Sequence, residues 1–389
     1  MEPQEPGVTV AENRETPLAD SQSWVTPNRL FFVRSHFDAP DVAPDDWTLH
    51  VEGCIDRELE LSWQQLNSLP QRSVFVTIEC AGNGRSFLTQ KVEGVQWRAG
   101  AVGHAEWSGV PLKYVLEQAG LTDEAVEILF EGADTGTEKD HDGLMPFARS
   151  LPLEKALHRD TLLATRMNGE LLDSSHGKPV RLIVPGWYGV ASVKWLRRIE
   201  AIGSRFRGYF QSKKYTYQES TGSGTQTVVV GPMPVKSEII RPADGSTLGI
   251  GTNRIFGMAW AGEDAVGAVE VSVDGGESWR QAELIGPRAP YSWTLWEYLW
   301  EVAGAGQTVL MSRAISEGGA VQPSRHDPLL GGYMITFSRQ TNVRIDPSQQ
   351  SQDSLGDILA LRLEIAVAAE ENSGLPLDVE MQFEMGGGI

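Results

Sequence analysis

The fold is decided by the stretch Thr77-Ile-Glu-Cys-Ala-Gly-Asn-Gly-Arg85. The β-rich apolar run at residues 73–79 predicts a buried strand that delivers Cys80 into a turn with two glycines. Glycine permits positive φ and lets a ligand approach the backbone closely. A thiolate is a nucleophile or a metal ligand, and the nearby charge of Arg85 favours it. On local chemistry alone, a buried inert cysteine stays open. Cys54 has no such turn or nearby cation, so we interpret it as structural.

Two further segments place positive charge next to apolar strands. One is Phe31-Phe-Val-Arg-Ser-His36, an apolar run that ends in a cation and an imidazole. The other runs from His176-Gly-Lys-Pro-Val-Arg181 to Ser192-Val-Lys-Trp195, around a predicted strand at residues 180–184. Basic groups that flank glycine turns and a strand are suited to holding an anion. Each is ordinary surface charge when taken singly, but together they predict a local electropositive pocket.

The composition excludes several classes of function. The 389 residues carry 33 basic and 52 acidic side chains, a net charge of −19, which argues against general binding to nucleic acid or anionic membranes. Two cysteines cannot form a disulfide framework or a four-thiolate zinc site. No apolar run approaches the roughly 20 residues of a membrane helix. The acidic start of the chain is unlike a signal peptide, which suggests the cytoplasm for the chain as given, or the periplasm if a signal was removed. The compartment stays open.

Changes in pattern divide the chain into four parts. Residues 1–23 are polar and aperiodic, which predicts an extended arm. Residues 24–232 mix predicted strands with a predicted helix at 110–120, which indicates an α+β domain. A stiff linker follows at 231–235. Short strands and turns over 233–340 are typical of an immunoglobulin-like β-sandwich. The tail, 341–389, predicts a helix and then an alternating strand, interpreted as a packing or dimer-edge element.

Taken in this order, the segments resemble the sulfite oxidase family of molybdenum enzymes. The resemblance runs from about residue 24 to 339, with residues 80–85 similar to the metal loop and residues 176–196 similar to the pterin-binding segments. It implies a molybdopterin-binding catalytic domain followed by a dimerisation sandwich. The implied cofactor is molybdenum–molybdopterin, with Cys80 as the thiolate ligand of the metal. A soft thiolate suits such a metal, and cations suit both the pterin phosphate and an oxyanion.

The resemblance also implies roles for individual residues. The expected oxyanion pocket and its wall consist of Arg34, Arg85, Trp97 and Tyr215. The expected pterin contacts are Phe32, Val33, Arg34, Ser35, His36, Asp134, His176, Arg181, Ser192, Val193 and Lys194. One departure concerns the second domain, where vertebrate relatives carry a further arginine. Here Arg325 follows Val321-Gln-Pro323, and whether it completes the anion pocket stays open.

The activity implied is oxidation of sulfite to sulfate by oxygen-atom transfer. No haem domain precedes residue 24, so electrons are expected to pass to a separate acceptor such as a cytochrome c. One alternative is a reductase of S-oxides such as methionine sulfoxide, and another is a non-enzymatic binding protein on this fold. The family uses its sandwich for a homodimer. The aromatic stretch at 291–300, with three tryptophans, is expected either to support that dimer or to fill the sandwich core.

Overall fold

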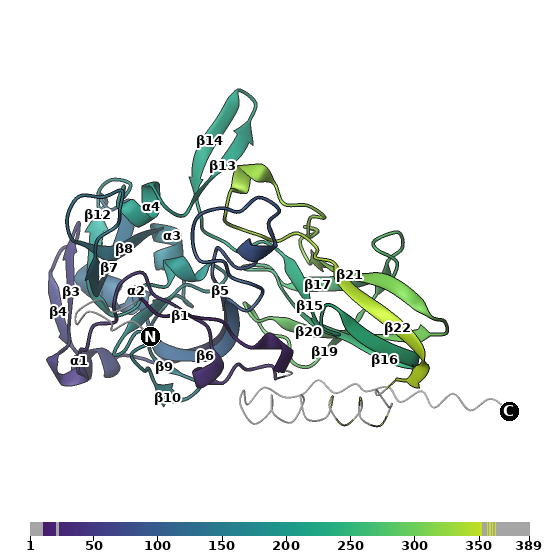
Figure 1. Cartoon of the computed structure of the whole chain (residues 1–389). Helices are drawn as coiled ribbons and strands as arrows, with labels where there is room; N and C mark the ends of the chain where they lie inside the picture. The colour runs from purple at the N-terminus through teal and green to yellow at the C-terminus, as the bar shows by residue number, and fades with distance from the viewer. Residues whose placement is uncertain are drawn as a thin grey trace, which may run out of the picture.

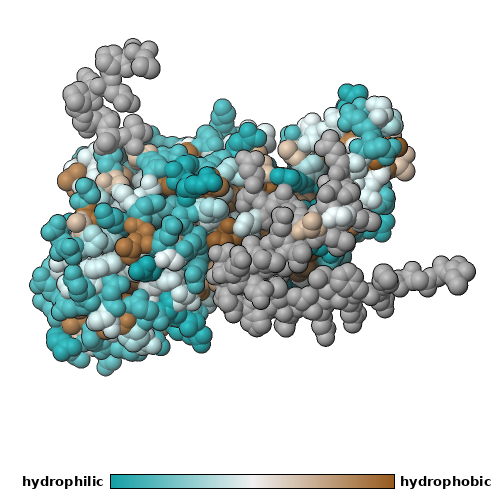
Figure 2. All heavy atoms as spheres, turned by 90° about the horizontal axis from the view of Figure 1, so that it is seen from below, coloured by the Kyte–Doolittle hydropathy of each residue, from teal (hydrophilic) through white to brown (hydrophobic). Residues whose placement is uncertain are grey.

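The computed structural model describes residues 11–20 and 23–351, together with 356, 358, 360 and 362. Two bodies lie side by side: a first domain built on two five-stranded sheets, and a β-sandwich (Figure 1). Hydrophilic residues cover most of the described face seen in Figure 2, with apolar residues scattered among them. In the described part of the chain, no helix is long and apolar enough to cross a membrane.

The first sheet carries the cysteine at the end of one strand. Its order is β10-β9-β6-β5, with β11 paired to β9. The strands are β5 (Arg72–Glu79), β6 (Val102–Pro111), β9 (Leu162–Met167), β10 (Glu170–Leu171) and β11 (Arg181–Ile183). The last four residues of β5 are all buried, as a strand rich in β-branched residues should be inside a domain. This strand therefore brings Cys80 into the interior, as the sequence predicts.

The second sheet supplies the opposite wall of the site. Its order is β4-β3-β12-β7-β8. The strands are β3 (Thr48–Gly53), β4 (Leu59–Ser62), β7 (Glu127–Gly136), β8 (Met145–Pro152) and β12 (Leu196–Ile202). Strand β7 carries Asp134, and the segment that enters β12 carries Lys194. The sheet thus places an acid and a base, far apart in sequence, beside one cavity.

Helices are short, so the α+β first domain is mostly strand. The α-helices are α1 (Trp63–Asn67), α2 (Leu112–Ala119), α3 (Leu153–Ala156) and α4 (Tyr209–Ser212). The 3₁₀ helices are η1 (Leu18–Asp20), η2 (Asn28–Leu30), η3 (Pro44–Asp46), η4 (Arg85–Phe87), η5 (Gly189–Ala191) and η6 (Pro328–Leu330). The predicted helix at 110–120 is confirmed as α2, which ends at Gly120 with φ of 74°.

The sandwich follows a protruding hairpin of β13 (Thr216–Thr221) and β14 (Gly224–Val229) (Figure 1). Its strand order is β18-β17-β21-β22-β16-β20-β19, with β15 paired to β16. The strands are β15 (Lys236–Arg241), β16 (Ser246–Trp260), β17 (Val266–Ser272), β18 (Arg280–Gln281), β19 (Glu283–Ile285), β20 (Thr294–Val302), β21 (Gly306–Ser316) and β22 (Thr341–Gln350). Trp296 is fully buried inside the sandwich, and Trp293 is fully buried against Trp24 of the first domain.

The sandwich extends further along the chain than the sequence predicts. Strand β22 pairs in parallel with β16 and antiparallel with β21, so the sheet of the sandwich continues about ten residues past the expected boundary at 340. In β22 only Thr341, Val343 and Ile345 are buried at alternate positions. The second half of the strand contains Pro347 and polar residues and lacks the alternation of apolar and polar residues that predicts a strand. Residues 356, 358, 360 and 362 are helical, whereas the predicted strand at 375–385 lies outside the described residues.

The described part of the N-terminal arm packs against the first domain. Strand β1 (Asn13–Arg14) pairs antiparallel with β2 (Val33–Arg34). The hydroxyl of Thr16 donates to the carbonyl of Val102 over 2.7 Å and accepts from the amide of Phe32 over 3.1 Å. Thr16 is 3% exposed. These contacts join the arm to the segment that carries Arg34.

Candidate active site

The cysteine turn is held by backbone hydrogen bonds at both ends. The amide of Cys80 donates to Ala101 over 2.8 Å, and the amide of Asn83 donates to the carbonyl of Cys80 over 2.8 Å. Gly84 has φ of 88°, in the left-handed region that favours glycine. A Cβ at Gly82 would lie 2.4 Å from the Arg85 guanidinium, so the turn has no room for a side chain there. Both glycines are therefore needed for this conformation.

The thiol of Cys80 is buried at 7% exposure. Burial raises its pKa, while the amide of Gly82 and the charges of Arg34 and Arg85 act in the opposite direction. Because burial has the largest effect, the free side chain is a thiol, and it becomes a thiolate only when a cation replaces the proton.

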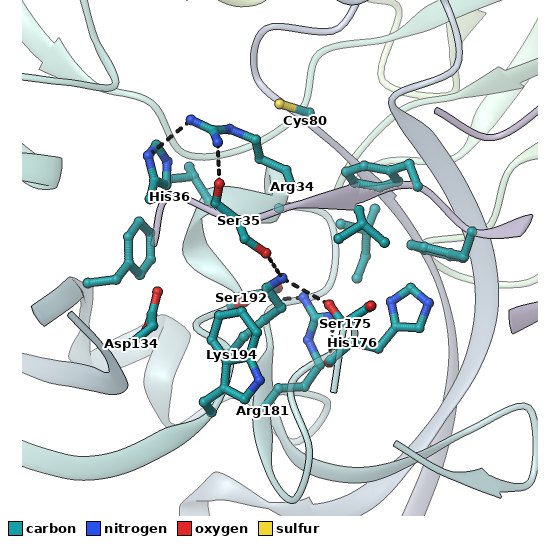
Figure 3. A pocket seen from close by; sticks show the side chains of 18 of the residues that line it. Arg34, Ser35, His36, Cys80, Asp134, Ser175, His176, Arg181, Ser192 and Lys194 are labelled. Carbon is teal, nitrogen blue, oxygen red and sulfur yellow. Dashed lines mark hydrogen bonds between the residues drawn. The ribbon is translucent and has the colours of Figure 1, made fainter. Parts of the chain in front are cut away.

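A cavity connects Cys80 with the cationic segments (Figure 3). It encloses about 680 Å³, including its open mouth. Its walls consist of Phe31, Phe32, Val33, Arg34, Ser35, His36, Ile78, Cys80, Ala81, Asp134, Phe147, Ser175, His176, Arg181, Gly189, Val190, Ser192, Lys194, Trp195 and Tyr215. Figure 3 shows Cys80 and Arg34 on one side, and Lys194 and Arg181 on the other. The cavity thus offers a thiol at one end and cations at the opposite end.

Three side chains near Cys80 form a hydrogen-bonded chain. Arg34 donates to Nδ1 of His36 over 3.1 Å, and Nε2 of His36 lies 2.6 Å from the phenol oxygen of Tyr215. Burial and the charge of Arg34 lower the pKa of His36 well below its ordinary value, so the ring is neutral and has one hydrogen. Because Arg34 can only donate, that hydrogen sits on Nε2 and points to Tyr215. The phenol hydrogen is then free to be donated into the cavity.

The backbone of Tyr215 is in an unusual conformation. Its φ is 54°, which few residues other than glycine adopt. Its amide donates to the hydroxyl of Tyr333 over 3.2 Å, and its carbonyl accepts from the amide of Val230 over 2.8 Å. The surrounding structure therefore holds the residue in this conformation and keeps the phenol aimed at His36.

At the other end, Lys194 and Arg181 bind mostly neutral partners. Lys194 donates to the Ser35 hydroxyl over 2.7 Å and to the Ser175 carbonyl over 2.9 Å. Arg181 donates to the carbonyls of His176 and Ser192. Burial, followed by the charge of Arg181, lowers the pKa of Lys194 to about 7, and burial lowers that of Arg181 to about 9. Because burial destabilises the positive charge of both groups, a bound anion would stabilise their charged forms.

Most of the residues expected at the site are brought together. Twelve expected residues line the cavity: Arg34, Cys80, Tyr215, Phe32, Val33, Ser35, His36, Asp134, His176, Arg181, Ser192 and Lys194. The structure also adds Ser175, whose hydroxyl donates to the carboxylate of Glu12 over 2.6 Å. Asn13 accepts from Arg34 over 3.1 Å. The polar, aperiodic sequence of the arm gave no signal of these contacts.

Three expected residues, Arg85, Trp97 and Val193, do not line the cavity. Arg85 turns away, donating to the carbonyls of Gly332 over 3.0 Å and Val95 over 2.9 Å. Trp97 is 3% exposed and packs in the apolar cluster that includes Cys80. Val193 is fully buried in the main core. Arg325, whose place in the anion pocket the sequence leaves open, is exposed and is not among the described residues that line the cavity.

Comparisons with known proteins identify the class of both parts. Residues 36–210 match the oxidoreductase molybdopterin binding domain, and residues 227–341 match the Mo-co oxidoreductase dimerisation domain. Human mitochondrial sulfite oxidase is 36% identical over 350 residues, covering 84% of this chain and 63% of the human protein. The sulfite oxidase of Gallus gallus is 34% identical over 359 residues, covering 86% of this chain and 77% of the chicken protein.

A solved structure agrees with these matches. The sulfane dehydrogenase SoxCD from Paracoccus pantotrophus aligns with a TM-score of 0.76 at 29% identity, covering 87% of each chain. The chain belongs to the sulfite oxidase family of molybdenum oxidoreductases. Its fold of a molybdopterin-binding domain followed by an immunoglobulin-like sandwich is the one that the resemblance predicts.

The cavity fits the molybdenum–molybdopterin cofactor of this family. Among the described residues, Nε of Arg181 and Oδ1 of Asp134 are buried without a hydrogen-bond partner. Burial raises the pKa of Asp134 to about 7, so near neutral pH this carboxyl can donate as well as accept. Such unpaired groups are suited to a polar ligand. Cys80 would hold the metal, Asp134 would contact the polar pterin, and Lys194 with Arg181 would hold the phosphate.

Proposed function

We propose that this chain oxidises sulfite to sulfate. Sulfite and water give sulfate, two protons and two electrons. When bound, the molybdenum cofactor supplies the oxygen atom and accepts the two electrons. The observation that carries the proposal is that Cys80 and Arg34 lie on one side of the cavity, opposite Lys194 and Arg181, while Tyr215 lines the same cavity. The family relationship to sulfite oxidases supports the same reaction.

Each of these side chains has a task in the proposed reaction. Cys80 holds the metal as a thiolate. Arg34, already fixed by Asn13 and His36, orients the sulfite dianion by a charge-assisted contact. Tyr215 donates its free phenol hydrogen to an oxyanion, and the neutral ring of His36 keeps that hydrogen directed into the cavity.

The cysteine provides the first experiment. Cys80→Ser replaces a soft, acidic ligand with a hard and much less acidic one, so sulfite turnover with an artificial electron acceptor should fall below one-tenth of wild type. Circular dichroism should be unchanged. Molybdenum and pterin content are measured on the same samples. Turnover above one-tenth in the metal-loaded variant would contradict the proposed role.

The structure also favours a second candidate, oxidation of a sulfane sulfur. SoxCD is named a sulfane dehydrogenase and aligns over most of this chain. Arg85 donates to backbone carbonyls, so Arg34 is the arginine that reaches the Cys80 end among the described lining residues. A single arginine suits a substrate with less negative charge than sulfite. Turnover of sulfite and of a low-molecular-weight persulfide, compared by kcat/KM on one holoenzyme preparation, distinguishes the two.

We further propose that electrons leave to a separate acceptor such as a cytochrome c, and that the sandwich forms a homodimer. The match to a dimerisation domain supports the dimer. In the aromatic stretch, Trp296 lies inside the sandwich and Trp293 packs against Trp24 of the first domain, so neither forms a dimer surface, whereas Trp300 is half-buried. Light scattering should give about twice the 42.6 kDa mass of the chain, whereas a mass near that of one chain at micromolar concentration would contradict the dimer.

A further inference from the structure

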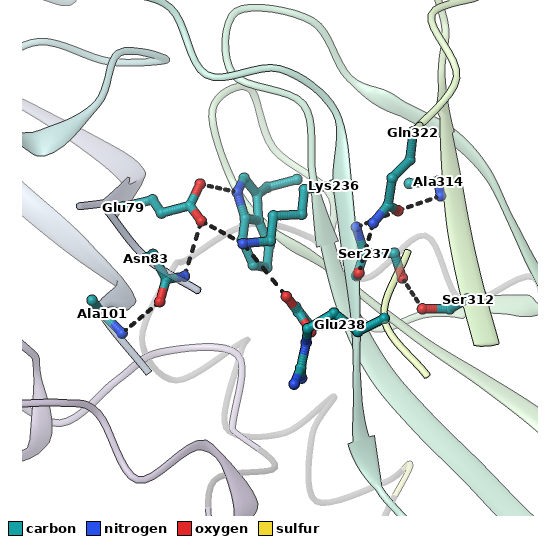
Figure 4. Close-up of polar contacts among 11 residues, drawn as sticks. Glu79, Asn83, Ala101, Lys236, Ser237, Glu238, Ser312, Ala314 and Gln322 are labelled. Atoms are coloured by element: carbon teal, nitrogen blue, oxygen red, sulfur yellow. Dashed lines mark hydrogen bonds and ion pairs between the residues drawn. The ribbon is translucent and has the colours of Figure 1, made fainter. Parts of the chain in front are cut away.

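The residue before the cysteine carries a buried carboxylate with three donors. Glu79 is 1% exposed at the end of β5. One carboxylate oxygen accepts from Asn83 over 2.9 Å and from the ammonium of Lys236 over 2.9 Å (Figure 4). The other accepts from the indole of Trp260 over 3.0 Å. The carboxylate is therefore enclosed by hydrogen bonds with no need for water.

Two of the three donors come from the sandwich. Lys236 begins β15 and Trp260 ends β16, and these two residues pair in register. Lys236 is 1% exposed, and its ammonium also lies 3.4 Å from the carboxylate of Glu238 and 5.5 Å from the centre of the Trp260 ring. A lysine this deeply buried is stable as a cation only with such partners. The pairing partner of Glu79 is thus a fixed part of the second domain.

The third donor ties Glu79 to the metal loop itself. Asn83 donates to Glu79 and accepts from the amide of Ala101 over 3.0 Å, while its own amide binds the carbonyl of Cys80. The side chains of Glu79 and Asn83 therefore close a bridge across the turn that contains Cys80. Because Asn83 contacts both Glu79 and Cys80, a shift of Glu79 toward or away from Lys236 should move the residues at both ends of the turn.

Further residues of the sandwich contact the loop that follows Cys80. The amide of Met334 donates to the carbonyl of Ala81 over 2.8 Å. Arg339 pairs with Glu238 over 2.7 Å and stacks on the ring of Phe87 at 3.9 Å. The loop is thus clamped at its start, middle and end by the sandwich. Of these contacts, the Lys236–Glu79 pair alone brings opposite full charges directly against the residue that precedes Cys80.

We propose that Lys236 is a positioning residue for the metal site, supplied by the sandwich. By neutralising Glu79, it holds the Cys80 turn in place and shields the metal from a neighbouring negative charge. The inference rests on the cofactor of the family and not on which sulfur compound is oxidised.

The test measures the metal centre without any substrate. In the Lys236→Met holoenzyme, Glu79 loses its counter-charge, and an unbalanced carboxylate stabilises the more oxidised metal. Redox titration at pH 8, followed by the paramagnetic resonance signal of the half-reduced metal, should show a lowered reduction potential and an altered signal. The double variant Glu79→Gln/Lys236→Met removes both charges and should return the potential toward wild type.

Lys155→Met is the matched control. Lys155 is also a buried lysine that joins the two bodies, through Glu263 at 2.5 Å, and it donates to the Pro185 carbonyl of its own domain at 2.8 Å, but within the described part of the chain no hydrogen bond or ion pair joins it to the Cys80 turn. It should lower the melting temperature and leave the potential unchanged. An unchanged potential in Lys236→Met, or an equal shift in both lysine variants, overturns the proposal.

A milder variant covers the case in which Lys236→Met does not fold. Trp260→Phe keeps an aromatic side chain but removes the indole hydrogen bond to Glu79, together with part of the buried ring volume. It should shift the potential in the same direction by less, and no shift overturns the proposal. Because no substrate is present, either result is independent of whether sulfite is the substrate.

Discussion

His36 and Tyr215 lie 179 residues apart in the sequence and meet at 2.6 Å between Nε2 and the phenol oxygen. The ring of His36 also stacks on Phe147 at 5.2 Å between ring centres, which limits its rotation. A neutral ring held in this orientation leaves Tyr215 one free hydrogen and one direction in which to donate it.

Tyr215→Phe should therefore lower kcat for sulfite more than it raises KM. The lost hydrogen bond to a charged oxygen corresponds to about 1.5–3 kcal/mol, or roughly ten- to a hundred-fold. Steady-state kinetics with saturating acceptor measures this. Tyr217→Phe, two residues further on β13, serves as the control and should behave as wild type. Equal kinetics in both variants would show that the phenol takes no part.

Replacing the two arginines should give different results. Arg34→Gln should raise the sulfite KM about ten- to a hundred-fold, because a charge-assisted contact is lost. Arg85→Gln should instead lower the melting temperature, since the carbonyls of Gly332 and Val95 lose their donors at roughly 1–3 kcal/mol each. An equal rise in KM with unchanged melting would mean that Arg85 turns toward substrate.

Retention of the cofactor should depend on pH through Lys194. The ammonium form binds a phosphate, and burial holds its pKa near 7 in the protein alone, so affinity should fall as pH rises above 7. Asp134, with a pKa of about 7, becomes an anion over the same range and acts in the same direction. Molybdenum per chain, measured after gel filtration at pH 6.5 and at pH 9, reports the loss.

Lys194→Met should retain less cofactor at pH 6.5 and show a weaker dependence on pH. Lys91→Met changes an exposed lysine and is the control. The assignment of Lys194 to the phosphate end fails if both variants retain cofactor as wild type does.

His104 should make the fold sensitive to acid. It is fully buried among Trp24, Phe75 and Trp293, and burial lowers its pKa to about 3. The unfolded chain binds a proton near pH 6.5 and the folded chain does not, so stability is lost as pH falls from 6.5 toward 3. The loss is roughly 1.4 kcal/mol per pH unit.

Urea unfolding at pH 7 and pH 5 tests this origin of the acid sensitivity. His104→Phe should reduce the difference in unfolding free energy between the two pH values, whereas His50→Gln, at an exposed position of β3, should preserve it. If His104→Phe leaves the difference in unfolding free energy between pH 7 and pH 5 unchanged, the acid sensitivity originates in other groups.

Local patterns predicted the elements that carry the site. The apolar run at 73–79 and the helical spacing after Pro111 reflect preferences of the chain itself, and both appear in the structure as β5 and α2. The direction of Arg85 could not be predicted, because it depends on the carbonyl of Gly332, almost 250 residues later. The pairing of Glu79 with Lys236 is likewise set by how the two bodies pack, which no local pattern records.

The N-terminal arm has a practical consequence for anyone who shortens this protein. The matched molybdopterin-binding region begins at residue 36, so Arg34 and its partner Asn13 both fall outside it. Cutting at residue 24, the expected domain start, would delete the strand that pairs with the Arg34 segment and the carboxylate that receives Ser175. A fragment chosen from the domain matches alone would thus lack the contacts that hold Arg34 and Ser175 at the cavity. Residues 11–20 should therefore be kept in any shortened protein.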